Sequence, residues 1–246
     1  MGLLSWIKEK CQDVKEGIKT VLNEVKVKTA DAVSRLATRT KEWGGKVKEA
    51  IKRAGTKIGI ILKPKRPHVP TEHEKRKADE CVDLINRTFR SGIKNTLMNQ
   101  PPAERLETVR EFTKRATQVL NLTDVKLELE DLGATTMGGL NPETNVFTLN
   151  AAMLVCDDAE LIEEQVFTVI HELTHKRQFD AIRDYANGKP IDKYGYSERQ
   201  IYEFARNWKC YIQPRENYEW YRKQPLENAA YGFEDMVKAK YYSINF

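Results

Sequence analysis

The sequence predicts a mainly helical α+β fold with a small β-sheet over residues 71–246, preceded by a long amphipathic helical segment over residues 1–62. Three observations predict this organisation. Aliphatic residues recur every eleven positions in the first segment, prolines interrupt residues 63–70, and the rest combines long stretches of helical periodicity with two short alternating runs. Because three prolines in eight residues prevent a continuous helix, residues 63–70 are interpreted as a linker between two modules.

Residues 1–62 carry an approximate repeat of eleven residues. Eleven residues make close to three helical turns, so apolar residues at this interval form one stripe along a helix. The repeated positions are Val14, Val25, Leu36, Val47 and Ile58. Residues 1–66 also hold 17 Lys and Arg against 7 Asp and Glu, a balance of +10, whereas the whole chain carries +5. The sequence therefore predicts a basic amphipathic helix.

Such a helix can bury its apolar stripe in three ways. It can lie on an anionic membrane surface, pair with a second copy as a right-handed coiled coil, or fold back as a helical hairpin. Small and polar residues within the stripe favour the membrane surface over tight coiled-coil packing. Nucleic acid is the weaker candidate partner, because few aromatic residues are interleaved with the positive charges.

Two helices are predicted at the start of the second module. Thr71, followed by two glutamates, is typical of a helix N-terminus, and apolar residues at helical spacing predict a helix over 71–97. Pro101 and Pro102 stop that helix and open the next one, which is predicted over 103–120.

Two short strands are predicted next. Residues 125–129 alternate apolar and charged side chains, and residues 145–149 form a second short run rich in strand-forming residues. The small residues at 133–139 predict a turn region between them.

Three further helices are predicted over 158–186, 197–211 and 225–240. Asp158 lies near the start of the longest one, where an N-cap is expected. The apolar positions of this helix are Leu161, Ile162, Val166, Val169, Ile170 and Leu173. Gly188, Pro190 and Gly195 mark the loop that ends it.

The most informative motif is His171-Glu172-Leu173-Thr174-His175, in the middle of the longest predicted helix. Two histidines four residues apart lie on one face of a helix, so their imidazoles can share a metal ion. Glu172 then lies beside that metal, where it can take a proton from a bound water. The motif therefore predicts a zinc site and hydrolytic chemistry.

This H-E-x-x-H pattern resembles the zinc metallopeptidases called zincins, whose order of elements is also helices, a small sheet and then the motif helix. The resemblance implies a strand before the motif helix that forms the sheet edge above the cleft, which is residues 145–149 here. The alternative is that these residues form an internal strand.

Catalytic zinc needs a third protein ligand and one position for water. A metzincin-like site would place that ligand at position 181, which is Ala181, so this class is excluded. Residues 224–230, Gln-Pro-Leu-Glu-Asn-Ala-Ala, resemble the Q-P-x-E-x-x-A element of short bacterial and phage-encoded gluzincins. These enzymes also favour a glutamine three residues after the second histidine, as Gln178 is here. The resemblance implies Glu227 as the ligand.

Other carboxylates stay open as the third ligand. Asp192, in a loop that loosely resembles the corresponding loop of aspzincins, is the runner-up. The remaining candidates are Glu198, Glu203, Glu219 and Glu234.

The resemblance implies a zinc metalloendopeptidase that acts on a protein or peptide substrate. Zn²⁺ held by His171, His175 and Glu227 would activate water, with Glu172 as the general base. Tyr231, one turn after Glu227, is the first candidate for a donor to the oxyanion, and Tyr194 and Tyr196 are the alternatives. Glu234 and Asp235 are candidates for orienting the histidines.

The alternative function is a lipid- or protein-binding amphipathic helix protein that carries an inactive zincin scaffold. For the peptidase hypothesis, the pairing of a short zincin with an unrelated N-terminal module resembles toxin-type bacterial metallopeptidases in architecture alone. The chain has no run of 18 apolar residues and no convincing signal peptide. We therefore expect a cytoplasmic protein, with peripheral membrane contact through residues 1–62.

Overall fold

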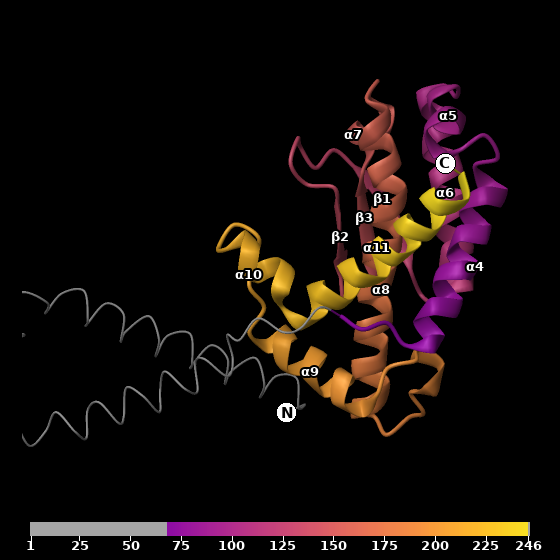
Figure 1. Cartoon of the computed structure of the whole chain (residues 1–246). Helices are drawn as coiled ribbons and strands as arrows, with labels where there is room; N and C mark the ends of the chain where they lie inside the picture. Colours follow the sequence, from indigo (N-terminus) through magenta and orange to yellow (C-terminus); the bar gives the residue numbers. More distant parts are fainter. Residues whose placement is uncertain (1–67, 246) are drawn as a thin grey trace, which may run out of the picture. The chain divides into compact units, whose positions relative to one another are not determined.

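The computed structural model describes residues 68–245 (Figure 1). This part of the chain is a mainly helical α+β structure with one three-stranded mixed sheet, as the sequence predicts. Its helices are α4 (Glu72–Thr88), α5 (Ile93–Met98), α6 (Pro102–Val119), α7 (Ala151–Val155), α8 (Ala159–Ala186), the 3₁₀ helix η1 (Asp192–Tyr194), α9 (Glu198–Lys209), α10 (Tyr218–Lys223) and α11 (Pro225–Asn245). Its strands are β1 (Lys126–Glu130), β2 (Gly138–Asn141) and β3 (Val146–Asn150).

The larger of the two compact units of the chain, Arg66–Trp208 with Ile212–Phe246, contains the sheet, the core and the candidate site. The eleven-residue repeat of 1–62 and most of the linker lie outside the described residues. The membrane-surface, coiled-coil and hairpin interpretations of that segment therefore stay predictions.

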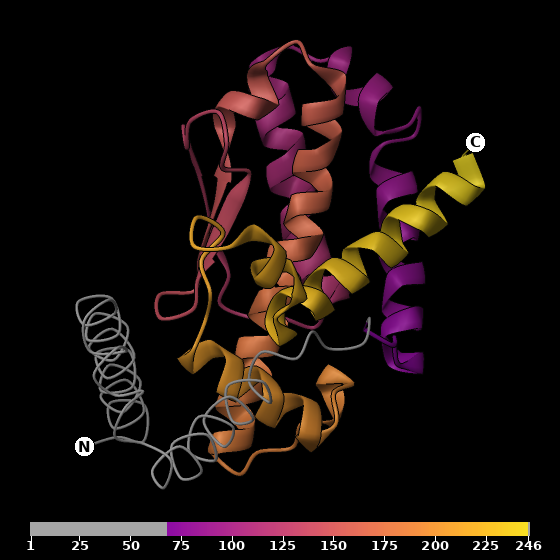
Figure 2. The same ribbon diagram turned by 60° about the vertical axis from the view of Figure 1, so that its left-hand side comes forward.

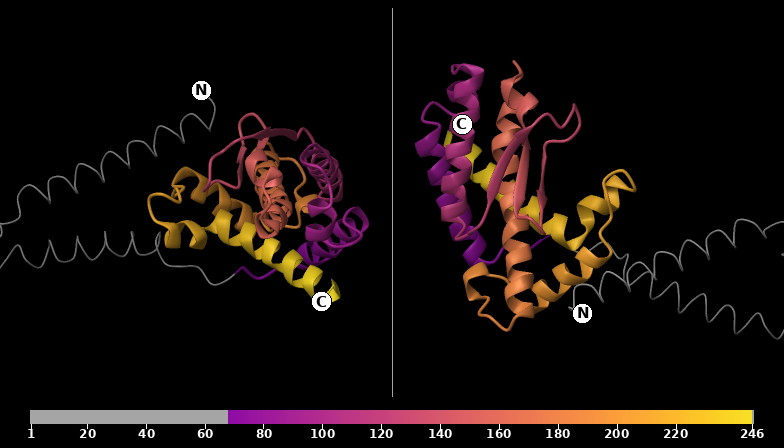
Figure 3. Two further views of the ribbon diagram at one scale, coloured as in Figure 1. Left: turned by 90° about the horizontal axis from the view of Figure 1, so that it is seen from above. Right: turned by 180° about the vertical axis from the view of Figure 1, so that it is seen from behind.

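Helix α8 is the central element of this unit. The Asp158 side chain caps it by accepting hydrogen bonds from the backbone N–H groups of Glu160 and Leu161, at 2.9 and 3.1 Å. Most residues from Ile162 to Asp184 are buried, which is typical of a helix covered on every side. Seen from above, α8 lies between the sheet and α11, with α4 and α6 on a third side (Figure 3).

The sheet has the strand order β1-β3-β2, so β3 is its middle strand. β1 pairs with β3 in parallel, and β2 pairs with β3 antiparallel. The expectation that residues 145–149 form the sheet edge is therefore wrong, and the alternative of an internal strand is correct. The edge strand that contacts α8 is β2.

The sequence did not predict β2, because glycine and asparagine are depleted in strands. Its first residues fall in the segment 133–139, which was expected to be a turn region. Gly138 allows the close approach of neighbouring elements: a Cβ atom there would lie 2.9 Å from the Thr148 carbonyl oxygen and 3.1 Å from the Thr168 side chain. Gly138 therefore lets β2 pack tightly between β3 and α8.

The single helix expected over 71–97 is two helices, α4 and α5. Gly92 breaks it with a φ of +86°, a conformation that glycine adopts at little cost. The Tyr241 hydroxyl accepts a hydrogen bond from the Ile93 backbone N–H at 3.0 Å, so α11 holds the start of α5. Helical periodicity continues across the break and therefore could not reveal it.

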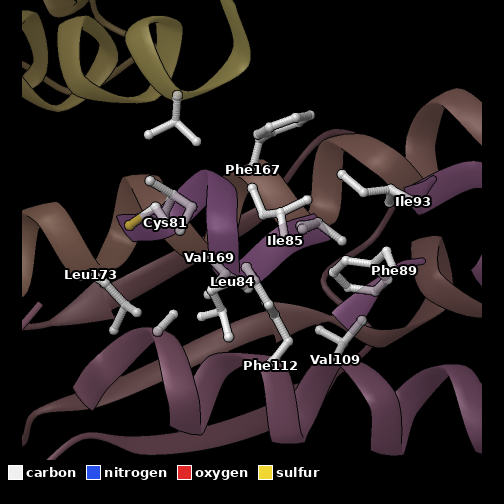
Figure 4. Packing of buried hydrophobic residues seen from close by; sticks show 14 of the residues in the cluster. Cys81, Leu84, Ile85, Phe89, Ile93, Val109, Phe112, Phe167, Val169 and Leu173 are labelled. Carbon is white, nitrogen blue, oxygen red and sulfur yellow. The ribbon is translucent and has the colours of Figure 1, made fainter. Parts of the chain in front are cut away.

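The core lies where α4, α6 and α8 meet (Figure 4). Phe89 of the α4 C-terminus packs against Phe112 of α6, with ring centroids 5.4 Å apart. Figure 4 shows these rings among aliphatic side chains from all three helices, including Ile85, Val109 and Val169. This packing fixes the rotation of α8 about its axis and so fixes which of its residues face α11.

The other predicted helices correspond to α6, α8, α9 and α11, and α11 continues five residues beyond the expected end at 240. Helices α7 and α10 have only five and six residues, too few for periodicity to indicate them. Within the described part of the chain, no helix is long and apolar enough to cross a membrane.

Candidate metal centre

Helix α11 runs obliquely across α8 (Figure 2). The two motif histidines lie on α8, one turn apart, and both contact Glu227 of α11. Both are buried, with 6 % of His171 and 7 % of His175 exposed. Their rings are nearly perpendicular, and their Nε2 atoms lie 3.1 Å apart. Helical spacing thus places two imidazole nitrogens at one point, as the motif predicts.

The third residue at this point is Glu227, in the first turn of α11. Pro225 begins this helix, where a missing N–H costs nothing. The Asn207 side chain accepts a hydrogen bond from the Leu226 backbone N–H at 2.9 Å, which ties the helix start to α9. Glu227 is fully buried, with Oε1 3.1 Å from His175 Nε2 and Oε2 3.4 Å from His171 Nε2.

These three side chains form the one His, Cys, Asp or Glu group within residues 68–245 that could hold a metal ion. Two ligand atoms bound tetrahedrally to zinc, each about 2.0–2.1 Å from the metal, lie about 3.4 Å apart. The two Nε2 atoms lie 3.1 Å apart, Glu227 Oε1 lies 3.1 Å from His175 Nε2, and Glu227 Oε2 lies 3.4 Å from His171 Nε2. These distances are close to that separation, so the three side chains could share one metal ion.

The outer nitrogens of both histidines are hydrogen bonded. His171 Nδ1 lies 2.9 Å from Glu234 Oε2, and His175 Nδ1 lies 2.9 Å from Gln178 Oε1. The Gln178 amide nitrogen donates to the Leu226 carbonyl at 3.0 Å, so its oxygen faces the histidine. Both acceptors require a proton on Nδ1, which leaves a lone pair on each Nε2.

Three lone-pair donors therefore converge in a buried site, two Nε2 atoms and the Glu227 carboxylate. They repel one another unless a cation lies between them, either a proton or a metal ion. The donor set of two nitrogens and one carboxylate oxygen suits zinc, and three protein ligands leave a position for water. The residues present could thus hold a metal ion through three protein ligands.

The pKa shifts of the three residues also indicate that the group attracts positive charge. Burial lowers the pKa of His171, but side-chain hydrogen bonds to Glu227 and Glu234 outweigh it and raise that pKa to about 10. Burial also opposes the raised pKa of His175, and the charge of Glu227 overcomes it. Burial raises the pKa of Glu227, but the charge of His175 and the hydrogen bond to His171 hold it far below its usual range. The site therefore favours bound positive charge.

The metal-free protein is expected to lose stability as the pH rises from about 7 toward 10. A histidine whose pKa is raised on folding stabilises the native state fully below its unfolded pKa of about 6.5. That contribution is lost as the pH passes through the folded value of about 10. A bound metal ion replaces the proton, so the zinc-loaded protein should lose less stability over the same pH range. The melting temperatures of the metal-free and zinc-loaded proteins across this pH range test the prediction. Melting temperatures that fall equally in both forms would contradict it.

Glu172 lies next to the group, almost fully buried, on the side of α8 that faces β2. Burial raises the pKa of its carboxyl group, while the charges of His175 and His171 lower it in part. A hydrogen bond with the Leu140 backbone also lowers it, and this contact links the carboxylate to β2. A carboxylate with a raised pKa is suited to act as a base near neutral pH.

A hollow of about 620 Å³ lies along β2. All four residues of β2 line it, and Trp208 of α9 lies on its wall. Phe179 connects the hollow to the histidines: its ring centroid lies 4.8 Å from that of Trp208 and 6.4 Å from that of His175. The hollow therefore lies along an edge strand, and Phe179 lies between its Trp208 wall and His175.

Of the three candidate tyrosines, Tyr231 lies against the metal group. Its ring centroid is 4.4 Å from that of His171, and the Arg222 guanidinium lies 3.8 Å from the centroid of the same ring. The Tyr194 hydroxyl donates instead to Asp184 at 2.7 Å, and Tyr196 packs against Phe204. The structure thus brings one tyrosine to the histidines.

The other candidate ligands lie outside the group. Asp192, the runner-up, is exposed in η1, and Glu219 is exposed and paired with Lys223. Neither Glu198 nor Glu203 belongs to the metal-competent group found in the described chain. Glu234 contacts the outer nitrogen of His171, as expected of an orienting carboxylate, whereas Asp235 is exposed.

Sequence reasoning missed two features around the site. The Leu140 backbone contact could not be found, because β2 was not predicted. The pairing of Lys238 with Glu234, at 2.8 Å, was missed although the two residues are four apart on a predicted helix. A spacing of four residues on a helix favours an ion pair, so the sequence already contained the signal for this contact.

Comparison with protein-family models, curated proteins and solved structures found no match to this chain.

Proposed function

We propose that the chain is a zinc-dependent endopeptidase of the gluzincin type. The observation that carries this proposal is the buried group of His171, His175 and Glu227, whose nitrogen and oxygen atoms converge so that one metal ion could bind all three. An H-E-x-x-H helix supplies two of these residues and also Glu172. A bound metal ion would satisfy all three lone-pair donors that face one another in the interior.

The proposed chemistry divides between the metal and the chain. Zinc bound here would supply a Lewis acid that polarises the peptide carbonyl and lowers the pKa of water. Glu172 takes the proton of the attacking water and delivers it to the leaving amine. Tyr231 is the proposed hydrogen-bond donor to the oxyanion, because its ring centroid lies 4.4 Å from that of His171.

The hollow beside β2 is the proposed binding site for the substrate backbone. An extended peptide can add to an exposed strand edge through main-chain hydrogen bonds. The Leu140 backbone contact with Glu172 supports this proposal, because it links the lining of the hollow to the base. The protein or peptide substrate is therefore proposed to bind in an extended conformation.

Hydrolysis should depend fully on the bound metal. We expect the zinc-loaded full chain to cleave members of a mixed peptide library, as read by mass spectrometry, and to lose this activity with a zinc chelator. Added zinc should restore the activity, because the three ligands lie on two packed helices and need no new fold. Cleavage that persists after zinc has been shown to be absent would contradict the proposal. Zinc binding without cleavage would favour the inactive scaffold.

A further inference from the structure

The contact between α8 and α11 contains a continuous row of polar side chains. On α11, Glu227, Glu234 and Lys238 are seven and four residues apart, which places them on one face. On α8, Glu164 and His171 are seven apart and face the same row. The row therefore extends from the metal group to a lysine that no step of the proposed chemistry uses.

Lys238 occupies a fixed position in this row. Its Nζ atom lies 2.8 Å from Glu234 Oε1 and 2.7 Å from Glu164 Oε2, and it lies 5.0 Å from the centroid of the Phe167 ring. Only 21 % of the lysine side chain is exposed. Two carboxylates and an aromatic face thus hold the ammonium group from both helices.

Each oxygen of Glu234 has its own partner. Oε1 accepts from Lys238, and Oε2 accepts from His171 Nδ1 at 2.9 Å. With one oxygen fixed by the lysine, the other points at the imidazole. Without the lysine, Glu234 would keep a buried charge with one fewer donor and could rotate away from the histidine.

We propose that Lys238 is a positioning residue for the metal centre, which acts by orienting the Glu234 carboxylate toward His171. The inference rests on the proposed zinc site but not on peptide hydrolysis. Residues that hydrogen bond to metal ligands fix the ring orientation of the ligands and tune metal affinity about 10- to 100-fold. Lys238 is one step further out, so we expect an effect on the order of 10-fold.

The test is the zinc affinity of the full chain, measured by competition with a chromophoric chelator. Lys238→Met should weaken zinc binding on the order of 10-fold. Lys238→Arg, which keeps the charge and the donors, should restore affinity to near the wild-type value. The cobalt-loaded Lys238→Met protein should show a shifted visible spectrum, since the geometry at His171 changes. Wild-type affinity and spectrum in this variant would overturn the inference.

A matched control comes from Lys94 of α5. It also pairs with two glutamates of α8, Glu160 at 2.5 Å and Glu163 at 3.3 Å, but touches no residue of the metal group. Lys94→Met should leave zinc affinity and the cobalt spectrum unchanged. An equal loss in both lysine variants would overturn the inference, because it would show a general effect of losing an ion pair on α8.

A double-mutant cycle separates positioning from packing. In a Glu234→Gln background, Lys238→Met should cause little further loss, since its route to the metal is already broken. A full additional loss would overturn the inference. If Lys238→Met does not fold, Lys238→Gln in the same cycle gives the same comparison.

A wild-type chain that binds no zinc would overturn both this inference and the proposed function, whereas zinc binding without hydrolysis would overturn only the proposed function.

Discussion

Replacing Glu227 by alanine is expected to reduce zinc affinity by more than about 100-fold, which exceeds the usual effect of residues that only contact a metal ligand. Glu227 supplies one of three converging donors, and its carboxylate is the only negative charge among them. The two histidines left behind cannot hold catalytic zinc with water alone. Zinc content by mass spectrometry and affinity by chelator competition measure the loss. Hydrolysis should fall with the metal.

Two further variants show whether a loss of zinc is caused by removal of the Glu227 ligand. Glu227→Gln keeps the size of the side chain and removes its charge, so it should also lose zinc without leaving a cavity. Asp192→Ala removes the runner-up ligand, which is exposed and outside the group, and should bind zinc like the wild type. Normal zinc content in both Glu227 variants would show that another residue completes the site.

Zinc loading should also change the stability of the fold. Several buried charges lie together around α8 and α11, and each loses hydration when the chain folds. Without a metal, the converging donors of His171, His175 and Glu227 need protons to reduce their repulsion. With a metal, the same arrangement becomes favourable, so binding free energy adds to folding free energy. The site and the packing of the two helices are therefore coupled.

The parts of the site that were predictable depend on local rules. His171 and His175 meet because an α-helix repeats every 3.6 residues, and that rule needs no tertiary information. Glu227 lies 52 residues after His175, so helical spacing alone cannot place it there. Its position was inferred from the resemblance of residues 224–230 to the gluzincin element, and the structure brings it to the histidines.

The features that were not predictable depend on tertiary contacts. β2 is held by its pairing with β3 and by the close packing that Gly138 allows, although its own residues have low strand propensity. The break at Gly92 is set by one positive φ angle and by Tyr241, which is 148 residues away from Ile93. Periodicity reports which face of an element is apolar, and it contains no information about these long-range contacts.

Replacing Glu172 by glutamine is expected to slow peptide hydrolysis by about 10²- to 10⁴-fold, the usual contribution of a general base. Glutamine has nearly the same shape, so it can still accept the hydrogen bond from the Leu140 backbone, and it cannot take a proton from water. Zinc affinity should stay within a few fold of the wild-type value, since Glu172 is not one of the converging ligands. The rate constant for cleavage of one identified peptide, with zinc content measured in parallel, gives both quantities.

Glu163→Gln is the matched control for this variant. Glu163 is also a buried glutamate of α8, but its partners are the Tyr242 hydroxyl, at 2.7 Å, and Lys94, which lie outside the metal group. Its replacement removes one buried carboxylate from the same helix and should leave the cleavage rate nearly unchanged. If Glu172→Gln kept wild-type activity with zinc bound, another group would have to accept the proton of water. Equal losses in the two variants would instead show that the charge of α8, rather than a base at position 172, controls the rate.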